Sequence, residues 1–349
     1  MSHFDDLTKL PQTRFSWRFQ KDEFAVWKAL HSTLLAMGYV LWPYSTSFKM
    51  DDEVSRNAKH VFPNGYLLAT PLRGIDGPVF TVEALRFWDT TPFNCIARTP
   101  DGHDAVIRVM ATGDDGREQL NIWRDLATAP HALLSSNHTL PLWREIDIGN
   151  ITLGVFPRVA ECMDIAYSRG SQNSVGDILD MIMQALEGLA FIHSLRIAHR
   201  DAFKSNFVVQ FFPESLKAGT VPVYKPRVYL IDFEAAIRFP EGCPPCERVC
   251  TGLPLAGSLL EAELYTRKMI PEMQNNEPYD PFKLDVWQLG QSFVDFNSTL
   301  EPVEEVLNCM AEMDPAERLT AGEALSRLRA YVESVPPKSL LIPPVVYQL

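Results

Sequence analysis

The sequence predicts an α+β fold in two parts, a small β-rich part followed by a larger helical part. Over residues 78–160 the chain consists of short runs rich in β-branched and aromatic residues, separated by turn signals, which is typical of strands. After residue 160 the apolar residues recur at helical spacing, first in a long stretch that begins near Val175. A chain of 349 residues is long enough for two parts that each bury a core.

Changes in composition along the chain divide it into four expected segments. Residues 1–77 are expected to form an N-terminal extension with a helix, residues 78–160 the β-rich part, residues 161–335 the helical part and residues 336–349 a proline-rich tail. The prolines of the tail are expected to exclude a helix and to leave it along the surface.

One amphipathic helix is expected in the extension, from Lys21 to Met37. Its apolar stripe consists of Phe24, Trp27, Leu30 and Leu34. Such a stripe needs a partner surface, which is either the main body of this chain or another protein. We expect packing on the main body.

The β-rich part contains four expected strands and one helix. The strands are Val79–Val82, Asn94–Ala97, Ala105–Val109 and Ile151–Phe156, with a hairpin turn at Pro100–Gly102 and a helix from Arg117 to Leu126. The helical part begins with a buried helix after Ser174, which forms a capping box with Asp177. Further helices are expected at Leu284–Phe296, Val303–Met310 and Thr320–Glu333, and strands at Asn206–Val209 and Val228–Phe233.

Charge and composition exclude several classes of protein. The 32 basic and 44 acidic side chains give a net charge of −12, so we expect no nucleic-acid partner, because binding to a phosphate backbone needs a cationic face. No apolar run approaches the roughly 20 residues of a membrane span. Six cysteines and an N-terminus without signal features predict a reduced, intracellular and cytoplasmic protein.

Five short motifs occur one after another between residues 199 and 318. They are His199-Arg200-Asp201 with Asn206 five residues after the aspartate, Ile231-Asp232-Phe233-Glu234, Pro271-Glu272, Asp285-Val286-Trp287 and Asp314-Pro315-Ala316-Glu317-Arg318. In spacing and order they resemble the motifs of the protein-kinase family. The resemblance covers roughly residues 78 to 335 and implies a bilobal kinase-like fold. The long loop before Asp232 is most similar to divergent kinase-like proteins of mushroom-forming fungi.

The resemblance implies ATP and Mg²⁺ as cofactors and assigns roles to particular side chains. Asp201 faces the acceptor hydroxyl as base or orienting group, and Asn206 and Asp232 are oxygen ligands for the metal. Lys204 is the lysine of the catalytic loop, although it follows Asp201 by three residues instead of two. Asp285 is expected to accept hydrogen bonds from the backbone of that loop, because a buried charge needs partners. Glu272 and Arg318 resemble a buried ion pair that holds the fold.

The β-rich part departs from the family pattern where nucleotide phosphates are held. No glycine occurs from Val82 to Ala97, so a glycine-rich phosphate loop is missing. Arg108 stands in place of the phosphate-contacting lysine, and its planar guanidinium is not equivalent to an ammonium. Gln119 stands in place of the glutamate that would pair with it. Glu234 replaces the glycine after Asp232-Phe233.

Several smaller signals have open interpretations. The segment from Phe156 to Val159 resembles the adenine-contacting hinge, although its apolar residues are equally compatible with a core. The Cys243-x-x-Cys246 pair with Cys250 has the spacing of a zinc site, but a fourth ligand is missing, so free thiols are the expected state. Three hydroxyl residues between Asp232 and Glu272 are candidate phosphorylation sites that could pair with Arg200, namely Thr251, Ser258 and Thr266. The loop at 211–226 is expected to be a surface insertion.

The leading prediction is ATP- and Mg²⁺-dependent phosphoryl transfer to a serine or threonine hydroxyl of a protein substrate. The alternative is a pseudokinase, an interaction or scaffold module with a protein partner and weak or no nucleotide binding, which the substitutions at Arg108 and Gln119 favour. A small-molecule kinase on a related fold is a third possibility, and the Asp285 and Arg318 motifs favour the protein-kinase branch over it.

Overall fold

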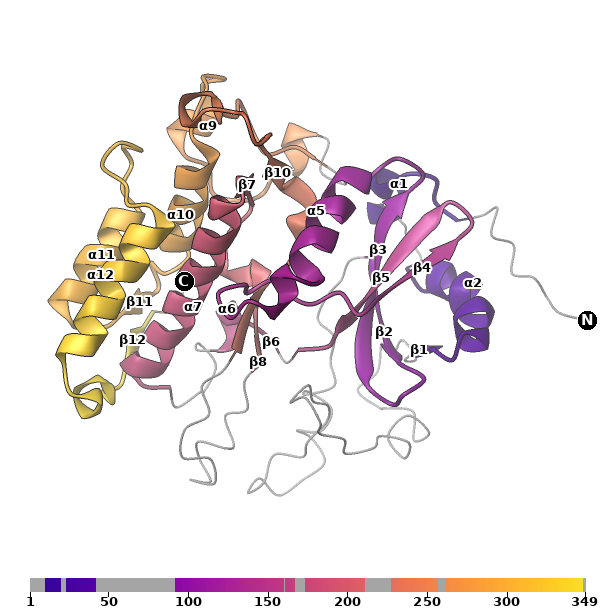
Figure 1. The fold of residues 1–349 in the computed structure, drawn as a ribbon, viewed down its shortest axis with the longest axis horizontal. Coiled ribbons are helices and arrows are strands. Elements are labelled where there is room, and N and C mark those ends of the chain that lie inside the picture. The colour runs from indigo at the N-terminus through magenta and orange to yellow at the C-terminus, as the bar shows by residue number, and fades with distance from the viewer. Residues whose placement is uncertain are drawn as a thin grey trace, which may run out of the picture. The chain divides into compact units, whose positions relative to one another are not determined.

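The computed structural model describes residues 10–19, 23–41, 92–159, 161–166, 173–210, 227–256 and 261–347. These residues belong to two compact units. Unit 1 comprises the described residues of Met1–Arg124 and Pro141–Ala160, and unit 2 those of Asp125–Leu140 and Glu161–Leu349. The architecture is mixed α+β (Figure 1). The expected strand at Val79–Val82 and the loop at 211–226 lie outside the described residues.

Unit 1 is built on an antiparallel sheet of five strands. The strand order is β1-β2-β3-β5-β4, and each neighbouring pair is antiparallel. The strands are β1 Val40–Leu41, β2 Asn94–Arg98, β3 Asp104–Thr112, β4 Arg144–Ile148 and β5 Ile151–Pro157. The predicted hairpin turn at Pro100–Gly102 joins β2 to β3, and Gly102 has a φ of 89°, which suits glycine.

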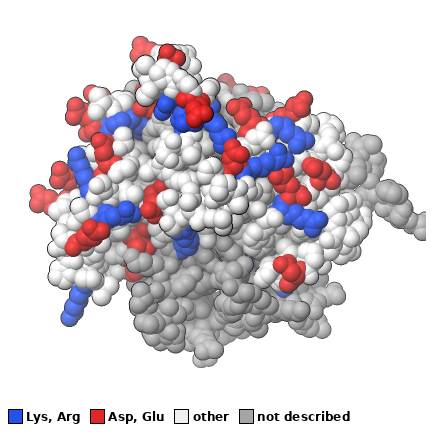
Figure 2. Space-filling view, in the orientation of Figure 1, with Lys and Arg blue, Asp and Glu red and all other residues white. Residues whose placement is uncertain are grey.

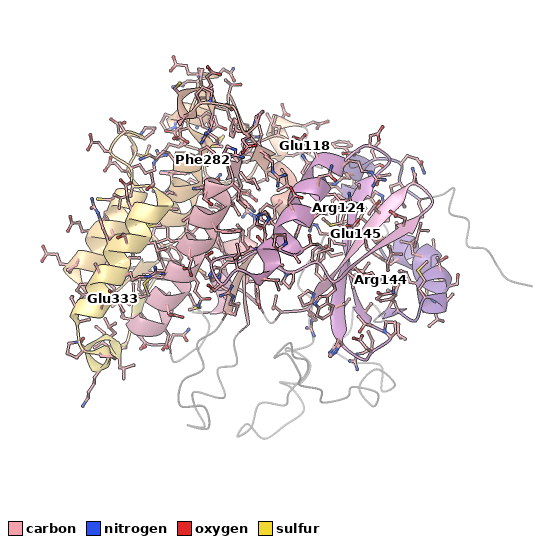
Figure 3. All side chains as sticks on the ribbon, viewed as in Figure 1. Glu118, Arg124, Arg144, Glu145, Phe282 and Glu333 are labelled. Carbon is pink, nitrogen blue, oxygen red and sulfur yellow. The ribbon has the colours of Figure 1, made fainter. Side chains whose placement is uncertain are left out.

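The helices of unit 1 are α1 Arg14–Arg18, α2 Glu23–Ala36 and α5 Arg117–Ala127, whose last three residues fall in unit 2 by sequence. The α2 and α5 helices confirm the predictions at Lys21–Met37 and Arg117–Leu126. An ion pair joins α5 to β4, because Arg124 donates from Nε and Nη2 to the two carboxylate oxygens of Glu145 at 2.6 and 2.5 Å. Figure 3 labels these two side chains, which point toward one another.

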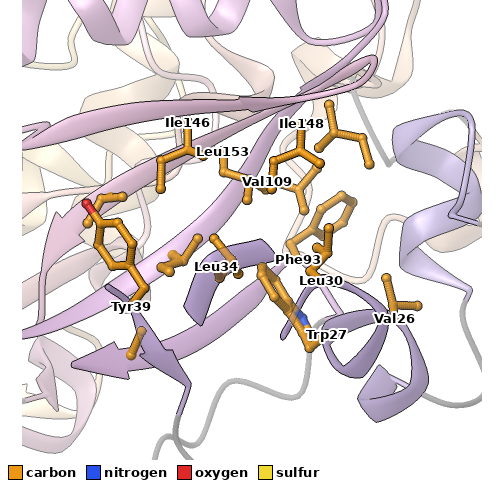
Figure 4. Packing of buried hydrophobic residues seen from close by; sticks show 14 of the residues in the cluster. Val26, Trp27, Leu30, Leu34, Tyr39, Phe93, Val109, Ile146, Ile148 and Leu153 are labelled. Atoms are coloured by element: carbon orange, nitrogen blue, oxygen red, sulfur yellow. The ribbon is translucent and has the colours of Figure 1, made fainter. Parts of the chain in front are cut away.

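The core of unit 1 lies between α2 and the sheet. Trp27, Leu30 and Leu34 are buried in one cluster with residues of the strands, as Figure 4 shows. The indole of Trp27 also donates to the backbone oxygen of Pro92 at 2.9 Å. The apolar stripe of the N-terminal helix therefore packs on the body of this chain, as expected. The side chain of Phe24 lies outside the described residues.

Unit 2 is mainly helical. Its α-helices are α6 Met163–Ala166, α7 Val175–Ser194, α9 Pro271–Gln274, α10 Pro281–Gln291, α11 Glu301–Met310 and α12 Ala321–Ser334. Its strands are β6 Glu161–Cys162, β7 Ile197–Ala198, β8 Phe207–Gln210, β9 Arg227–Leu230, β10 Ile237–Arg238, β11 Phe296–Asn297 and β12 Val345–Val346. Short 3₁₀ turns are η2 His131–Leu133, η3 Lys204–Asn206, η4 Phe233–Ala235, η5 Pro245–Glu247, η6 Ala262–Leu264 and η7 Pro337–Leu340.

The helix α7 is the central element of unit 2. Ten of its residues are buried, and α10 and α12 both pack against it. The predicted capping box is present, because the Ser174 hydroxyl accepts from the Asp177 backbone while the Asp177 carboxylate accepts from Ser174. The helix α10 ends at Gln291, earlier than predicted. The Ser292 hydroxyl donates to the Gln288 carbonyl there, and the chain then turns into β11.

The C-terminal tail differs from its prediction. One turn of 3₁₀ helix forms at Pro337–Leu340, although we expected the prolines to exclude helix. A proline at the start of a turn loses no hydrogen bond, because the first N–H groups have no acceptor there. The tail is also docked, since Leu340 is buried and the Val175 N–H donates to Ile342. The strand β12 then pairs with β11.

Charged side chains of both signs occur on the same face of the molecule (Figure 2). On the face drawn in Figure 2, lysine and arginine side chains are interspersed with aspartate and glutamate and do not gather into one patch. Within the described residues, no helix combines the length and the apolar character that a bilayer span requires.

Candidate functional site

A β-hairpin in unit 2 brings Asn206 and Asp232 to one place. The strands β8 and β9 are antiparallel, and Phe207 pairs with Leu230. Asn206 immediately precedes β8, and Asp232 follows β9 by two residues. The Ile231 N–H donates to the backbone oxygen of Asn206 at 2.9 Å, which continues the ladder by one more pair. The two side chains therefore lie at the same end of the hairpin, although 26 positions separate them in the sequence.

Asp201 is fixed to Asn206 through the asparagine amide. The Nδ2 group of Asn206 donates to the backbone oxygen of Asp201 at 2.8 Å and to its carboxylate Oδ2 at 2.7 Å. Asn206 is 6% exposed, so this contact is shielded from water. Asp232 is near enough for its charge to act on Asp201, so the structure brings together the three side chains that the sequence assigned to hydroxyl and metal.

Asp285 on α10 holds the loop that carries Asp201. Its side chain is fully buried and accepts from the backbone N–H groups of His199 at 2.8 Å and Arg200 at 2.6 Å. The ring of His193 contacts the same carboxylate, with Nε2 2.9 Å from Oδ2. These partners compensate a buried charge that would otherwise be costly, and they confirm the predicted hydrogen bonding of Asp285.

Gln288 is a second anchor that the sequence analysis did not identify. Its Oε1 accepts from the Ala202 N–H at 2.8 Å, and its Nε2 donates to the backbone oxygen of Arg200 at 3.0 Å. Gln288 lies three residues after Asp285, which puts both on one face of α10. A search for polar residues at helical spacing from Asp285 would have found it.

Arg267 is the most important residue that the sequence analysis missed. Its Nε lies 3.2 Å from Oδ1 of Asp201, and its Nη2 donates to Oδ2 at 3.2 Å. The guanidinium also stands over the Phe203 ring, with 5.2 Å between Cζ and the ring centroid. Because Arg267 follows Asp201 by 66 positions and belongs to no motif, no signal in the sequence pointed to this contact.

The electrostatics of Asp201 reflect these neighbours. Burial raises the pKa of the Asp201 carboxyl above its usual range, the charges of Arg267 and His199 oppose that rise, and the charge of Asp232 adds to it. Oδ1 is buried and receives no directed hydrogen bond from the described residues. Its described contact is the ion pair with Nε of Arg267, so Oδ1 can still accept a directed hydrogen bond when that contact is released.

Asp232 is held in an unusual backbone conformation. Its φ and ψ are both 63°, in the left-handed region that few residues other than glycine adopt. The next residue, Phe233, is fully buried and packs edge-on against the His199 ring at 5.0 Å. His199 in turn contacts the backbone oxygen of Ile231 at 2.9 Å. Packing on both sides of Asp232 thus maintains the strained residue.

Lys204 is held by two carboxylates other than that of Asp201. Its Nζ forms ion pairs with Asp295 at 2.5 Å and with Asp164 at 3.2 Å, and its backbone N–H donates to the Ser292 hydroxyl. Only 8% of Lys204 is exposed. These contacts connect the start of η3 to residues before and after it in unit 2. A role for Lys204 in the chemistry stays a prediction.

The nucleotide-binding candidates of unit 1 lie on different elements. Arg108 on β3 donates to the Asn94 side chain at 3.4 Å and lies over the Phe93 ring. Gln119 is half-buried on α5, and no hydrogen bond joins it to Arg108 within the described residues 92–159. Phe156 is buried and packs on Trp123 with ring centroids 4.7 Å apart, so its side chain belongs to the core. Val159, which follows β5, is half-buried.

Two further motifs have a structural explanation. Arg318 is fully buried and donates to both carboxylate oxygens of Glu272 at 3.0 and 3.2 Å, which confirms the predicted ion pair. The three cysteines near position 246 have free thiols, and no group of three or more metal-ligating side chains occurs in the described part of the chain.

The side chains at the hairpin end are compatible with a magnesium ion that also binds phosphate. Mg²⁺ commonly takes one or two protein oxygens and completes its shell with phosphate oxygens and water. Both amide hydrogens of Asn206 are directed to Asp201, which leaves the amide oxygen for a cation. Asp232 supplies a carboxylate. Two protein ligands are enough for this kind of site.

Comparison of the sequence with protein-family models gives no match, and comparison with curated proteins gives none either.

Proposed function

We propose that this protein is a protein-kinase-like phosphotransferase, which transfers a phosphoryl group from ATP to a serine or threonine hydroxyl of a protein substrate and needs Mg²⁺. The observation that carries the proposal is the arrangement in unit 2. Asp201 is fixed by Asn206, Asp232 lies at the same hairpin end, and Asp285 holds the connecting loop. The kinase-like bilobal fold is part of the same proposal and rests on the order of the motifs.

The chemistry assigned to this chain is mainly orientation. An acceptor hydroxyl would donate to Oδ1 of Asp201, the carboxylate oxygen that has no directed hydrogen bond from the described residues. Oδ2 cannot rotate into that position, because Asn206 holds it. A fixed carboxylate of this kind directs the oxygen lone pair toward phosphorus and receives the proton as the new bond forms. The magnesium ion, bound through Asn206 and Asp232, would supply positive charge to the phosphate oxygens.

The test is transfer of radiolabelled phosphate from ATP to a generic protein substrate in the presence of Mg²⁺. Asp201→Asn removes the proton acceptor but preserves the shape of the side chain, so we expect labelling to fall at least about 10³-fold. Asp114→Asn is the matched control, because Asp114 is exposed and lies in unit 1. Labelling that persists in Asp201→Asn would rule out the assigned role.

Two observations support a second candidate, an interaction module without catalysis. Arg108, the residue in place of the phosphate-contacting lysine, is engaged with Asn94 and Phe93, and residues 82 to 97 contain no glycine to let backbone amides approach phosphates. If the protein is such a module, we expect no transfer of radiolabelled phosphate and no change in the melting temperature on addition of ATP. We also expect Asp201→Asn to bind the protein's partners with unchanged affinity.

A further inference from the structure

We infer that Arg267, in the segment before α9, supplies a cation that contacts the transferred phosphoryl group. The inference rests on the proposed function and names a residue that no motif of the sequence identifies. It begins from the pairing of Arg267 with both carboxylate oxygens of Asp201.

Lys204, the lysine of the expected catalytic loop, already forms two ion pairs. Lys204 is buried, and two carboxylates, those of Asp295 and Asp164, hold its ammonium. A lysine in that environment would have to break both ion pairs to reach a phosphate. Phosphoryl transfer nevertheless needs positive charge near the attacking oxygen, because negative charge is spread over the transferred group in the transition state. The carboxylates of Asp201 and Asp232 increase the need for positive charge, because a carboxylate repels the phosphate oxygens.

Arg267 has the geometry that such a role requires. Its Nε and Nη2 face Asp201, and the stacking on Phe203 fixes the plane of the guanidinium. The hydrogens of Nη1 are not used by the described residues. Nη1 lies on the far side of Cζ from the edge that faces Asp201, so a phosphoryl oxygen would bind beside Asp201 and not between the two groups. Arginine offers five N–H donors in one plane, so it can bind a carboxylate and a phosphate oxygen at the same time.

Partial exposure allows Arg267 to move without loss of the fold. About 37% of its side chain is exposed, in contrast to the 10% of Lys204. When a hydroxyl takes Oδ1, Nε must release that oxygen, while the Nη2 contact to Oδ2 can persist as a pivot. The guanidinium then remains beside the reacting atoms. In this step the hydroxyl oxygen bonds to the γ-phosphorus of ATP, the bond from that phosphorus to the bridging oxygen breaks, and ADP leaves with the electron pair. The proton of the hydroxyl passes to Asp201, and no bond to Arg267 forms or breaks.

The first experiment measures nucleotide binding and needs no turnover. Affinities for Mg²⁺-ATP and Mg²⁺-ADP are determined by calorimetry for the wild type, for Arg267→Met and for the matched control Lys268→Met, whose exposed ammonium contacts Gln291. A cation on the transferred group predicts that Arg267→Met weakens ATP binding about tenfold, changes ADP binding less than about twofold, and that the control changes neither. Equal effects on both nucleotides, or none, would overturn the inference.

The second experiment distinguishes a cation that assists phosphoryl transfer from a side chain that only blocks the Asp201 carboxylate. We expect Arg267→Met to lower kcat about 10²- to 10³-fold with little change in the KM of the acceptor, and Arg267→Lys to restore part of the loss. An increase in kcat would show instead that Arg267 blocks the carboxylate, and the inference would be wrong. Circular dichroism and the melting temperature establish that the variants are folded. If the wild type binds neither nucleotide, the proposed function itself fails. If the wild type binds ATP and Arg267→Met binds it with the same affinity, only the inference on Arg267 fails.

Discussion

Asp285 anchors the loop that carries Asp201. Its buried carboxylate accepts from two backbone N–H groups and contacts His193. Asp285→Ala would leave these donors buried without an acceptor, so we expect a loss of about 3 kcal/mol in the free energy of unfolding. Urea denaturation measures it. The control Glu277→Ala, at an exposed position, should stay within about 0.5 kcal/mol of the wild type, and an equally mild Asp285→Ala would contradict the assignment.

The pKa of Asp201 predicts a pH dependence with a definite sign. Burial raises this pKa, the charges of Arg267 and His199 oppose the rise, and Asp232 adds to it. Because the folded state holds the proton more tightly than the unfolded chain, the contribution of Asp201 to stability falls as the pH rises from its ordinary pKa of about 3.9 to the folded value. Asp201→Asn does not ionise. Its stability relative to the wild type should therefore increase across that window, as urea titrations at several pH values can test, and a difference that shrinks would contradict this.

Arg267 is also expected to affect the pH dependence of the rate, through its effect on the pKa of Asp201. Its charge lowers the pKa of Asp201, so removal of that charge in Arg267→Met raises the pKa further. The carboxylate must be deprotonated to accept the hydroxyl proton, which means that the acid side of the pH–rate profile should move to higher pH in this variant. A profile with an unchanged acid side would show that Arg267 does not act on Asp201 in the working enzyme.

At the scale of elements, the helix N-termini carry part of the stability. The hydroxyls of Ser174 and Thr320 cap α7 and α12, and Thr320 lowers the pKa of Glu323 through its backbone N–H and its hydroxyl. We expect Ser174→Ala and Thr320→Ala each to cost about 1 kcal/mol in chemical denaturation. The control Ser326→Ala, on the exposed side of α12, should not destabilise, because alanine is the better helix former. A cost at position 326 equal to that at the caps would contradict the explanation.

The capped, strongly periodic elements could be predicted from the sequence, and the contact-dependent ones could not. The helices α2, α5, α7, α11 and α12 were predicted within a few residues, because an apolar stripe or a cap marks each one. The strands β7, β10 and β11 are two residues long, so they contain no periodicity to detect. The tail strand β12 exists only through its pairing with β11. Local pattern carries no information on such distant partners.

The candidate site likewise contains contacts that a local sequence pattern cannot predict. The resemblance of their motifs predicts Asp201, Asn206 and Asp232 as site residues, and the β8–β9 register explains why Asn206 and Asp232 lie at one end of the hairpin. Arg267 could not be predicted, because its contact with Asp201 depends on the path of a segment without a motif. The position of Lys204 depends likewise on Asp164 and Asp295, which lie 40 residues before it and 91 after it.

At the scale of the whole molecule, the N-terminal helix is part of a unit and not an appendage. Leu30 is fully buried between α2 and the sheet, whereas Lys28 is exposed. Leu30→Ala should lower the free energy of unfolding by about 2–5 kcal/mol, and Lys28→Ala should have little effect. Denaturant titration of both variants makes the comparison. A mild effect of Leu30→Ala would mean that α2 contributes little to unit 1.

The central claim is that Asn206 and Asp232 hold a magnesium ion on which ATP binding depends. The most direct measurement is the melting temperature as ATP is titrated with and without Mg²⁺, for the wild type and for Asp232→Asn. We expect an increase of several degrees in the wild type that requires Mg²⁺, and little or none in Asp232→Asn. A wild type whose melting temperature does not respond to ATP and Mg²⁺ would contradict the claim.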